Sequence, residues 1–286
     1  MRQIYGKLLL VTLLVVANVP VGAPPAFAQA LNTQINKAQG ESWDTIAQLP
    51  NWDGVWQSLL NRAGAGQLYK RSEMPFTPEW KKKVDALDAV RKRGGDVEAR
   101  GKYCLFFGSP GGMAGPQAFH EFVYTPGQVT VFDEQGYMRR IYTDGRKHHV
   151  GPPTLWGDSI GHWEGNSLVV DTINMQAGNE IDYGMPGGKN MHLTERIHFK
   201  DNDPSIMVID EVIEAPQAFT RPYRFSVEYG RREDGRMIEF DCAQNNRDLT
   251  LQPRELNRPR HPVKEIFKVD FVAVTDNIKN EFASPL

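Results

Sequence analysis

The stretch that decides the fold is FHEFVYTPGQVTVFDEQGYMRRIYTDG, residues 119–145. It contains three short segments rich in aromatic and β-branched residues, namely Phe119–Tyr124, Val129–Asp133 and Tyr137–Tyr142. Turn-forming residues follow each segment: Pro126-Gly127, then Asp133–Gly136, then Asp144-Gly145. Short strand-like runs joined by such turns pair side by side, so this stretch predicts a three-stranded antiparallel meander.

The same pattern continues toward the C-terminus. Further predicted strands are Ser159–Trp163, Ser167–Ile173, His192–Phe199, Ser205–Ile213, Arg221–Tyr229 and Arg236–Cys242, and Ile266–Val274 is a strand-like run near the end. No helical periodicity is evident between residues 110 and 245. Strands in hairpin succession favour a barrel or a strongly curved sheet over a parallel α/β fold. We therefore predict a mainly β chain, an antiparallel up-and-down meander forming a lipocalin-like barrel, with a β-sandwich as the alternative.

The predicted domain opens with Trp52-Asp53-Gly54-Val55-Trp56. A glycine two residues before a tryptophan at a strand start is similar to the opening of lipocalin-like barrels. In that interpretation Trp56 fills the barrel floor and Gly54 permits close packing.

One N-terminal amphipathic helix is predicted near residues 78–92. Thr77 is a suitable N-cap, and Pro78 suits the first helical position. Trp80, Val84 and Leu87 fall on one face at helical spacing. We expect this helix to lie across the sheet or to close one end of the barrel.

The N-terminus has the three parts of a secretory signal: basic residues at Arg2 and Lys7, an apolar run over residues 8–17, and a small-residue exit at Ala26-Phe27-Ala28. Prolines interrupt the apolar run before the roughly 20 residues that a membrane anchor needs. We predict a signal peptide at residues 1–28 that is cleaved near Ala28, a polar lead-in at 29–51 and a single β domain at 52–286. The product is then periplasmic or secreted, with no membrane insertion.

The net charge bears on the class of binding partner, and the two cysteines bear on disulfide formation. The whole chain has a formal net charge of −2, and without residues 1–28 it is −4, which gives no electrostatic reason to expect nucleic acid or anionic lipid. Two cysteines remain, Cys104 and Cys242, in a chain expected where disulfides persist. We predict a bond between them, with two buried free thiols as the alternative.

Glu195 is the most unusual polar residue in a predicted strand. Alternate residues of a strand face opposite sides, so Glu195 shares a face with Leu193, Ile197 and Phe199. If that face is the core, the carboxylate needs a partner, such as Arg140 or Arg146, or it becomes protonated. Two interpretations stay open: a general acid or base in an apolar lumen, or a structural Glu–Arg pair.

Asp158 enters a strand between Gly157 and Ser159. It is suited to orient a histidine, and His162, His148 and His192 are the candidates; a turn-forming aspartate is the alternative. Asp171 is most simply hydrogen-bonded to a neighbouring loop. The adjacent His148 and His149 lack the spacing of a zinc site, so we expect no metal.

Three strings, YTDGR (142–146), GDSIGHWEGNSLVVDT (157–172) and HLTERIHF (192–199), occur in this region. They resemble a large group of exported bacterial proteins that share YTDGR, GDSIGxWEG and TER-type strings. The resemblance covers roughly residues 50 to 250. It implies a shared exported β fold and transfers no reaction, because none is established for the group.

Two functions follow from these residues. The first is a cofactor-independent enzyme of isomerase, dehydratase or lyase type, acting on a small apolar or aromatic hydroxy or carbonyl compound. Its catalytic residues are Glu195, His192 and Asp158, and its substrate-binding residues are Arg140, Tyr142, Arg146, Trp156 and His162. The second is a non-catalytic periplasmic protein that binds a small hydrophobic ligand. Convergence of Glu195, Asp158, His192 and Arg146 in one pocket favours the enzyme, and their scatter over outer faces favours binding; a purely structural role is the third option.

Overall fold

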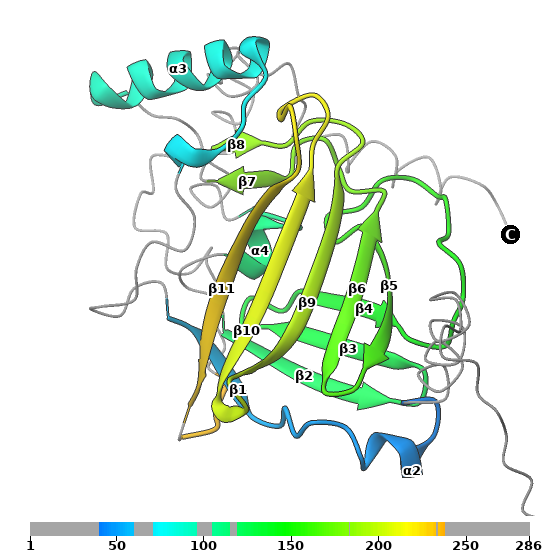
Figure 1. Ribbon diagram of the computed structural model, residues 1–286. Helices are drawn as coiled ribbons and strands as arrows, with labels where there is room; N and C mark the ends of the chain where they lie inside the picture. The colour runs from blue at the N-terminus through cyan, green and yellow to red at the C-terminus, as the bar shows by residue number, and fades with distance from the viewer. Residues whose placement is uncertain are drawn as a thin grey trace, which may run out of the picture. The chain divides into compact units, whose positions relative to one another are not determined.

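Nine strands form a closed barrel in a computed structural model that describes residues 40–59, 71–95, 105–114, 119–182, 184–232 and 234–237. The order around the barrel is β1-β11-β10-β9-β6-β5-β4-β3-β2 (Figure 1). The strands are β1 (Val55–Ser58), β2 (Phe119–Thr125), β3 (Gln128–Asp133), β4 (Met138–Tyr142), β5 (Asp158–Glu164), β6 (Ser167–Ile173), β9 (His192–Lys200), β10 (Asp203–Glu214) and β11 (Tyr223–Arg231). The predicted mainly β barrel is confirmed.

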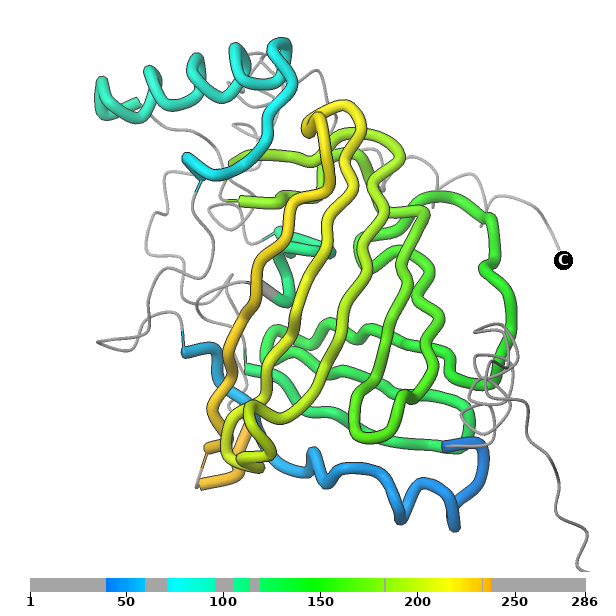
Figure 2. The backbone as a smooth tube through the Cα atoms, in the orientation of Figure 1, coloured from blue at the N-terminus to red at the C-terminus, as the bar shows by residue number. Residues whose placement is uncertain are grey.

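The barrel is mixed, and the expectation of a purely antiparallel meander was wrong at one place. β4 and β5 run parallel, with Ile141 opposite Ser159 and Tyr142 opposite Ile160. Parallel neighbours need a crossover instead of a hairpin, and residues 143–157 provide it. The tube in Figure 2 shows this long connection between the two strands. The turn at Asp144-Gly145 therefore begins a crossover and not the next hairpin.

Short elements complete the described chain. Helix α3 (Pro78–Lys92) has Thr77 as N-cap and buries Trp80, Val84 and Leu87, as predicted. The other elements are α2 (Trp43–Ile46), the 3-10 turn η1 (Arg71–Glu73), α4 (Gly111–Ala114) and a two-stranded ribbon of β7 (Glu180–Asp182) and β8 (Met185–Pro186). The expectation of no helix between residues 110 and 245 was wrong at α4. It is too short to produce a helical period in the sequence.

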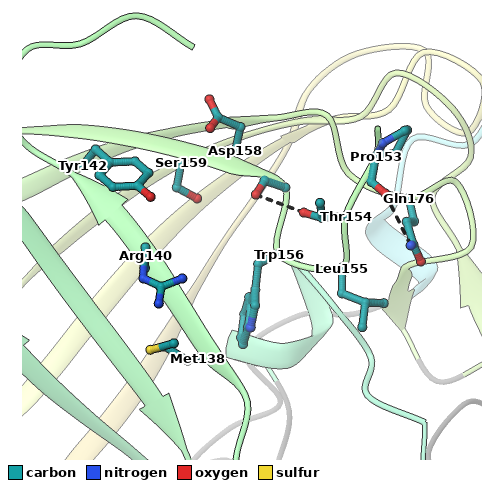
Figure 3. Close-up of a pocket in the computed structure, with 11 residues that line it drawn as sticks. Met138, Arg140, Tyr142, Pro153, Thr154, Leu155, Trp156, Asp158, Ser159 and Gln176 are labelled. Carbon is teal, nitrogen blue, oxygen red and sulfur yellow. Dashed lines mark hydrogen bonds between the residues drawn. The ribbon is translucent and has the colours of Figure 1, made fainter. Parts of the chain in front are cut away.

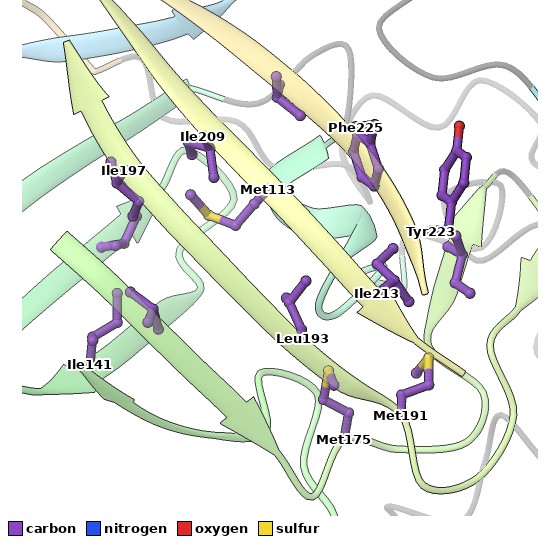
Figure 4. Packing of buried hydrophobic residues seen from close by; sticks show 14 of the residues in the cluster. Met113, Ile141, Met175, Met191, Leu193, Ile197, Ile209, Ile213, Tyr223 and Phe225 are labelled. Carbon is purple, nitrogen blue, oxygen red and sulfur yellow. The ribbon is translucent and has the colours of Figure 1, made fainter. Parts of the chain in front are cut away.

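Strand alternation places apolar side chains inside the barrel. On β9, Leu193, Glu195 and Ile197 are buried, and on β6 every second residue is buried. Leu193, Ile209, Ile213 and Met113, which comes from α4, lie together in this core (Figure 4).

Trp56 is fully buried, as predicted for the opening strand. Its Nε1 donates to the Trp52 carbonyl at 2.8 Å, and the Arg231 guanidinium lies 4.6 Å from the centre of its ring. A glycine is needed at position 54 for a reason other than the predicted close packing. Its φ is +98°, and a Cβ there would meet nothing within 4 Å, so the backbone conformation requires the glycine.

Several predictions fall on residues outside the described ranges. They are the signal peptide at 1–28, Cys104 and Cys242, most of the strand Arg236–Cys242, and Ile266–Val274. In the described part of the chain, no helix has the length and apolar character needed to cross a membrane.

Candidate functional site

A pocket of about 460 Å³ lies where the crossover passes the outer face of β4 (Figure 3). We call it the loop pocket. Its lining residues are Met138, Arg140, Tyr142, Pro153, Thr154, Leu155, Trp156, Gly157, Asp158, Ser159 and Gln176. Four residues selected from the sequence, Arg140, Tyr142, Trp156 and Asp158, therefore share one pocket.

Alternation along β4 explains one wall of the loop pocket. Arg139 and Ile141 are buried inside the barrel, so Met138, Arg140 and Tyr142 point outward. The opposite wall is the end of the crossover, which is held by hydrogen bonds to the segment after β6. Thr154 N donates to Asn174 O at 3.1 Å, and Gln176 N donates to Thr154 O at 3.0 Å.

Two hydrogen-bond donors of the loop pocket have no partner among the described residues. The Arg140 guanidinium, on an exposed side chain, forms no hydrogen bond or ion pair there. The indole Nε1 of Trp156 is buried and also has no acceptor there. Figure 3 shows Arg140 and Trp156 facing each other from β4 and the crossover. A buried donor without an acceptor is costly, and this applies to Trp156 Nε1. The Arg140 guanidinium is exposed to solvent and is available to an anion that enters the pocket.

Asp158 connects the loop pocket to a row of titratable side chains on the outer face of the barrel. His148 Nδ1 lies 2.8 Å from Asp158 Oδ2, and its Nε2 lies 2.9 Å from Asp171 Oδ1. His192 Nε2 lies 3.0 Å from both oxygens of Asp171, and its Nδ1 lies 2.8 Å from Glu214 Oε2. We call Asp158, His148, Asp171, His192 and Glu214 the imidazole–carboxylate chain.

Two of the hydrogen bonds expected from the sequence occur among these residues. Asp158 is hydrogen-bonded to His148, one of its three candidate histidines, and it also accepts from the His149 backbone amide. Asp171 is hydrogen-bonded to His148 of the neighbouring loop. Partial burial of His192 opposes its protonation, but hydrogen bonds and charges of Asp171 and Glu214 outweigh that and raise the pKa of His192. The imidazolium form of His192 is therefore more populated than that of an ordinary histidine at the same pH.

Glu195 lies inside the barrel and does not itself line the loop pocket, although its partner Arg139 donates at 3.2 Å to Ser159 Oγ, and Ser159 is a lining residue. It is fully buried and paired with Arg139, not with Arg140 or Arg146 as predicted. Arg139 Nη1 donates to Glu195 Oε1 at 2.9 Å, and its Nη2 donates to Oε2 and, at 2.9 Å, to Thr172 Oγ1. The prediction of the partner was wrong because Arg140 points outward and Arg146 is paired with Asp144 in the crossover. The geometry is that of the structural Glu–Arg pair.

A second buried carboxyl faces this pair. Glu211 lies directly opposite Glu195 across β9 and β10, and neither of its oxygens has a hydrogen-bond partner among the described residues. Burial and the neighbouring Glu195 raise the pKa of Glu211 well above the usual range of a glutamate, despite the positive charge of Arg139. Glu211 is therefore a neutral acid inside the barrel.

His120 and Asp133 add to the buried polar groups. They lie opposite each other on β2 and β3, and His120 Nε2 is 3.6 Å from Asp133 Oδ2. Burial, helped by the charge of Arg139, lowers the pKa of His120 to about 3, so the ring is neutral. Burial raises the pKa of Asp133 to about 6, while a backbone hydrogen bond from Gln135 opposes this shift.

The remaining predicted residues lie outside the loop pocket. Arg146 is paired with Asp144 at 2.6 Å and stacks on Tyr142, with its guanidinium carbon 3.9 Å from the ring centre. His162 is exposed on β5 and contacts Glu164 at 3.1 Å. His192 belongs to the imidazole–carboxylate chain. Glu195, Asp158, His192 and Arg146 thus do not converge in one pocket.

Sequence reasoning missed the buried Arg139, Glu211 and His120, although the signal was available for the first two. Arg139 shares the inward face of β4 with Ile141, and Glu211 shares a face with Ile209 and Ile213. The alternation rule that selected Glu195 would have selected both.

No set of three or more His, Cys, Asp or Glu side chains within the described ranges is arranged to hold a metal ion. Comparison of the chain with known protein families and with curated proteins finds no match. Its function is therefore argued from its own geometry.

Proposed function

We propose that this protein binds a small molecule in the loop pocket, and that the ligand has a flat apolar body and an anionic or carbonyl oxygen. The observation that carries the proposal is the pair of donors, Arg140 and Trp156, which lack acceptors among the described residues of one pocket. The volume of about 460 Å³ lies within the range of small-molecule sites.

The chemistry of the pocket walls supports this ligand class. Met138, Leu155 and the Trp156 ring offer apolar surface, and Arg140 offers a planar cation that binds a carboxylate or phenolate through two parallel hydrogen bonds. Asp158 is the acid in the lining, and its Oδ2 already accepts bonds from the His148 ring and the His149 amide. An aromatic carboxylate or a phenolic compound suits this arrangement.

The separate positions of Glu195, Asp158, His192 and Arg146 favour binding over catalysis. Glu195 is held inside the barrel by Arg139, and His192 and Arg146 do not line the loop pocket. A carboxylate with both oxygens bonded to a buried guanidinium is a poor proton carrier for a substrate outside the barrel.

A cofactor-independent acid–base enzyme of isomerase, dehydratase or lyase type is the second candidate. It is favoured by Asp158, which lines the pocket and is hydrogen-bonded to a histidine. In this alternative Asp158 exchanges a proton with the substrate and Arg140 holds the oxyanion. Small molecules that co-purify with the protein are incubated with wild type and with Asp158→Asn. Conversion by the wild type alone supports this candidate, and equal product patterns reject it.

Calorimetric titration with 2-naphthoate and its neutral analogue 2-naphthamide tests the binding proposal. We expect 2-naphthoate to bind the full chain, and Arg140→Met to weaken that binding about tenfold or more, because a charged hydrogen bond is lost. The amide should be affected much less.

Arg224→Met is the matched control, since Arg224 is an exposed arginine on β11 that does not line the pocket. It should bind 2-naphthoate as the wild type does. Equal affinity of wild type and Arg140→Met for the carboxylate would rule out the loop pocket as its site.

We also propose that the protein works in the periplasm or outside the cell. The support is the N-terminal sequence, with its basic start, apolar run and Ala26-Phe27-Ala28 exit. The mass of the protein recovered from a periplasmic extract tests this, and a mass that retains residues 1–28 would contradict it.

A further inference from the structure

The imidazole–carboxylate chain joins the crossover to four strands of the barrel. His148 lies in the crossover, Asp158 begins β5, Asp171 lies on β6, His192 begins β9 and Glu214 ends β10. All four imidazole nitrogens lie within 3.0 Å of a carboxylate oxygen. Each ring thus lies between two carboxylates, and both rings share Asp171.

Ionised carboxylates on both sides of a ring are both satisfied only when the ring donates from both of its nitrogens. An ionised carboxylate only accepts hydrogen bonds, and a neutral imidazole has one N–H donor and one nitrogen lone pair. A neutral ring between two carboxylates therefore makes one hydrogen bond and places its lone pair against the other oxygen. An imidazolium ion donates from both nitrogens, so only the charged rings satisfy all the contacts of the chain.

We propose that the imidazole–carboxylate chain is a protonation-dependent tie, which holds residues 143–150 and the Asp158 wall of the loop pocket in place while His148 and His192 are imidazolium ions. Loss of these protons breaks contacts of the tie and loosens the first half of the crossover. The tie makes the pocket sensitive to pH in the range where histidines change charge.

The charged groups around His148 and His192 favour the protonated form of both rings. His148 is faced by Asp158 of β5 and Asp171 of β6, and His192 is faced by Asp171 and by Glu214 of β10. Arg146 is the cation whose charge also reaches Asp158, and it is already paired with Asp144. The carboxylates favour the charged rings, and the raised pKa of His192 is consistent with this.

The second half of the crossover is held by contacts that do not titrate near neutral pH. Asn174 Nδ2 donates to Gly151 O at 2.8 Å and to Pro152 O at 3.2 Å. Asn179 Nδ2 donates to Leu155 O at 2.6 Å, and Ser109 N donates to the same oxygen at 2.9 Å. The pH-dependent loosening should therefore be confined to residues 143–150. The second half of the crossover then serves as an internal control.

The consequence for ligand affinity rests on the proposed function of the loop pocket. Positive charge is lost from the imidazole–carboxylate chain when its rings deprotonate, so an anion in the pocket beside Asp158 meets a more negative wall. We expect 2-naphthoate, which stays ionised throughout, to bind about fivefold more weakly at about pH 8.5 than at about pH 5.5.

Amide hydrogen exchange of the full chain tests the tie without any ligand. After correction for intrinsic exchange, we expect protection of residues 143–150 to fall about tenfold from about pH 5.5 to about pH 8.5. Asp171→Asn removes the carboxylate that both rings share. This variant should have low protection at both pH values and a lower His192 pKa in an NMR titration.

Asn174→Gly is the matched control, because it removes a side-chain contact of the same crossover that does not titrate, and glycine tolerates the φ of +59° at this position. It should reduce the protection of Gly151 and Thr154, the two residues of 151–154 that have a backbone N–H, by the same factor at both pH values. Wild-type protection that does not change with pH, or an Asp171→Asn variant that keeps the wild-type pH dependence, would overturn the tie. If protection changes as expected and 2-naphthoate does not bind, the tie stands and the proposed ligand is wrong.

Discussion

Replacing Arg139 by methionine should destabilise the protein strongly, and the loss should depend on pH. Arg139 and Glu195 are both fully buried, and the guanidinium binds both oxygens of the carboxylate. Removing one partner of a buried ion pair typically costs about 3–5 kcal/mol. Here Glu195 would be left opposite Glu211 with no cation between them.

The magnitude can be worked out from the proton that Glu195 must then bind. A buried carboxylate without a partner becomes neutral, and at pH 7 protonating a group with an ordinary pKa near 4.3 costs about 4 kcal/mol. At pH 5 the same step costs about 1 kcal/mol. We therefore expect the penalty of Arg139→Met to shrink by about 3 kcal/mol between these two pH values.

Urea unfolding followed by tryptophan fluorescence measures both free energies. The double variant Arg139→Met/Glu195→Leu should recover most of the loss, because both buried charges are then gone. A single variant within about 1 kcal/mol of wild type at pH 7, or a penalty that is equal at pH 7 and pH 5, would refute the assignment of this pair as a buried ionic contact.

Three further predictions follow from other residues. The contribution of His120 to the free energy of unfolding should fall by up to about 1.4 kcal/mol per pH unit below about pH 6.5, because folding holds the pKa of His120 at about 3 and only the unfolded chain binds that proton; it is measured by urea unfolding as the pH dependence of the difference between wild type and His120→Leu, since the raised pKa of Asp133 acts in the opposite direction. Gly54→Ala should cost about 1–3 kcal/mol, since the φ of +98° disfavours a Cβ, and an unchanged melting temperature would contradict this reasoning. Cys104 and Cys242 should resist thiol labelling in the unfolded, non-reduced protein, and two labelled thiols would contradict the predicted bond.

Alternation along the strands was the most reliable guide to the fold. The predicted strand Ser167–Ile173 has the bounds that the structure shows, and Glu195 is buried on the face where its apolar neighbours placed it. The helix of residues 78–92 was equally clear, because its N-cap and its apolar spacing agree. These features depend on residues close together in the sequence, so local periodicity is enough to predict them.

The partners of polar residues were harder to predict. Strand alternation indicates the face on which a residue lies, but not which strand is its neighbour. Arg139 pairs with Glu195 because β4, β5, β6 and β9 are adjacent in the barrel, while the two residues are 56 positions apart in the sequence. Arg140 and Arg146 were the suggested partners, but Arg140 points outward and Arg146 pairs with Asp144. The outward direction of the Arg140 side chain is enough to exclude it as a partner of Glu195. Identifying Arg139 also requires knowing which strands are neighbours in the closed barrel.

The sequence by itself therefore determined the strands, the helix, the N-cap and the inward position of Glu195, because each is a consequence of local backbone geometry and side-chain alternation. The tertiary structure decided that β4 and β5 run parallel, and hence that the crossover passes over the outer face of β4. That path creates the loop pocket and brings His148 between Asp158 and Asp171. Contacts of this kind depend on which strands become neighbours when the barrel closes, and no local pattern encodes that choice.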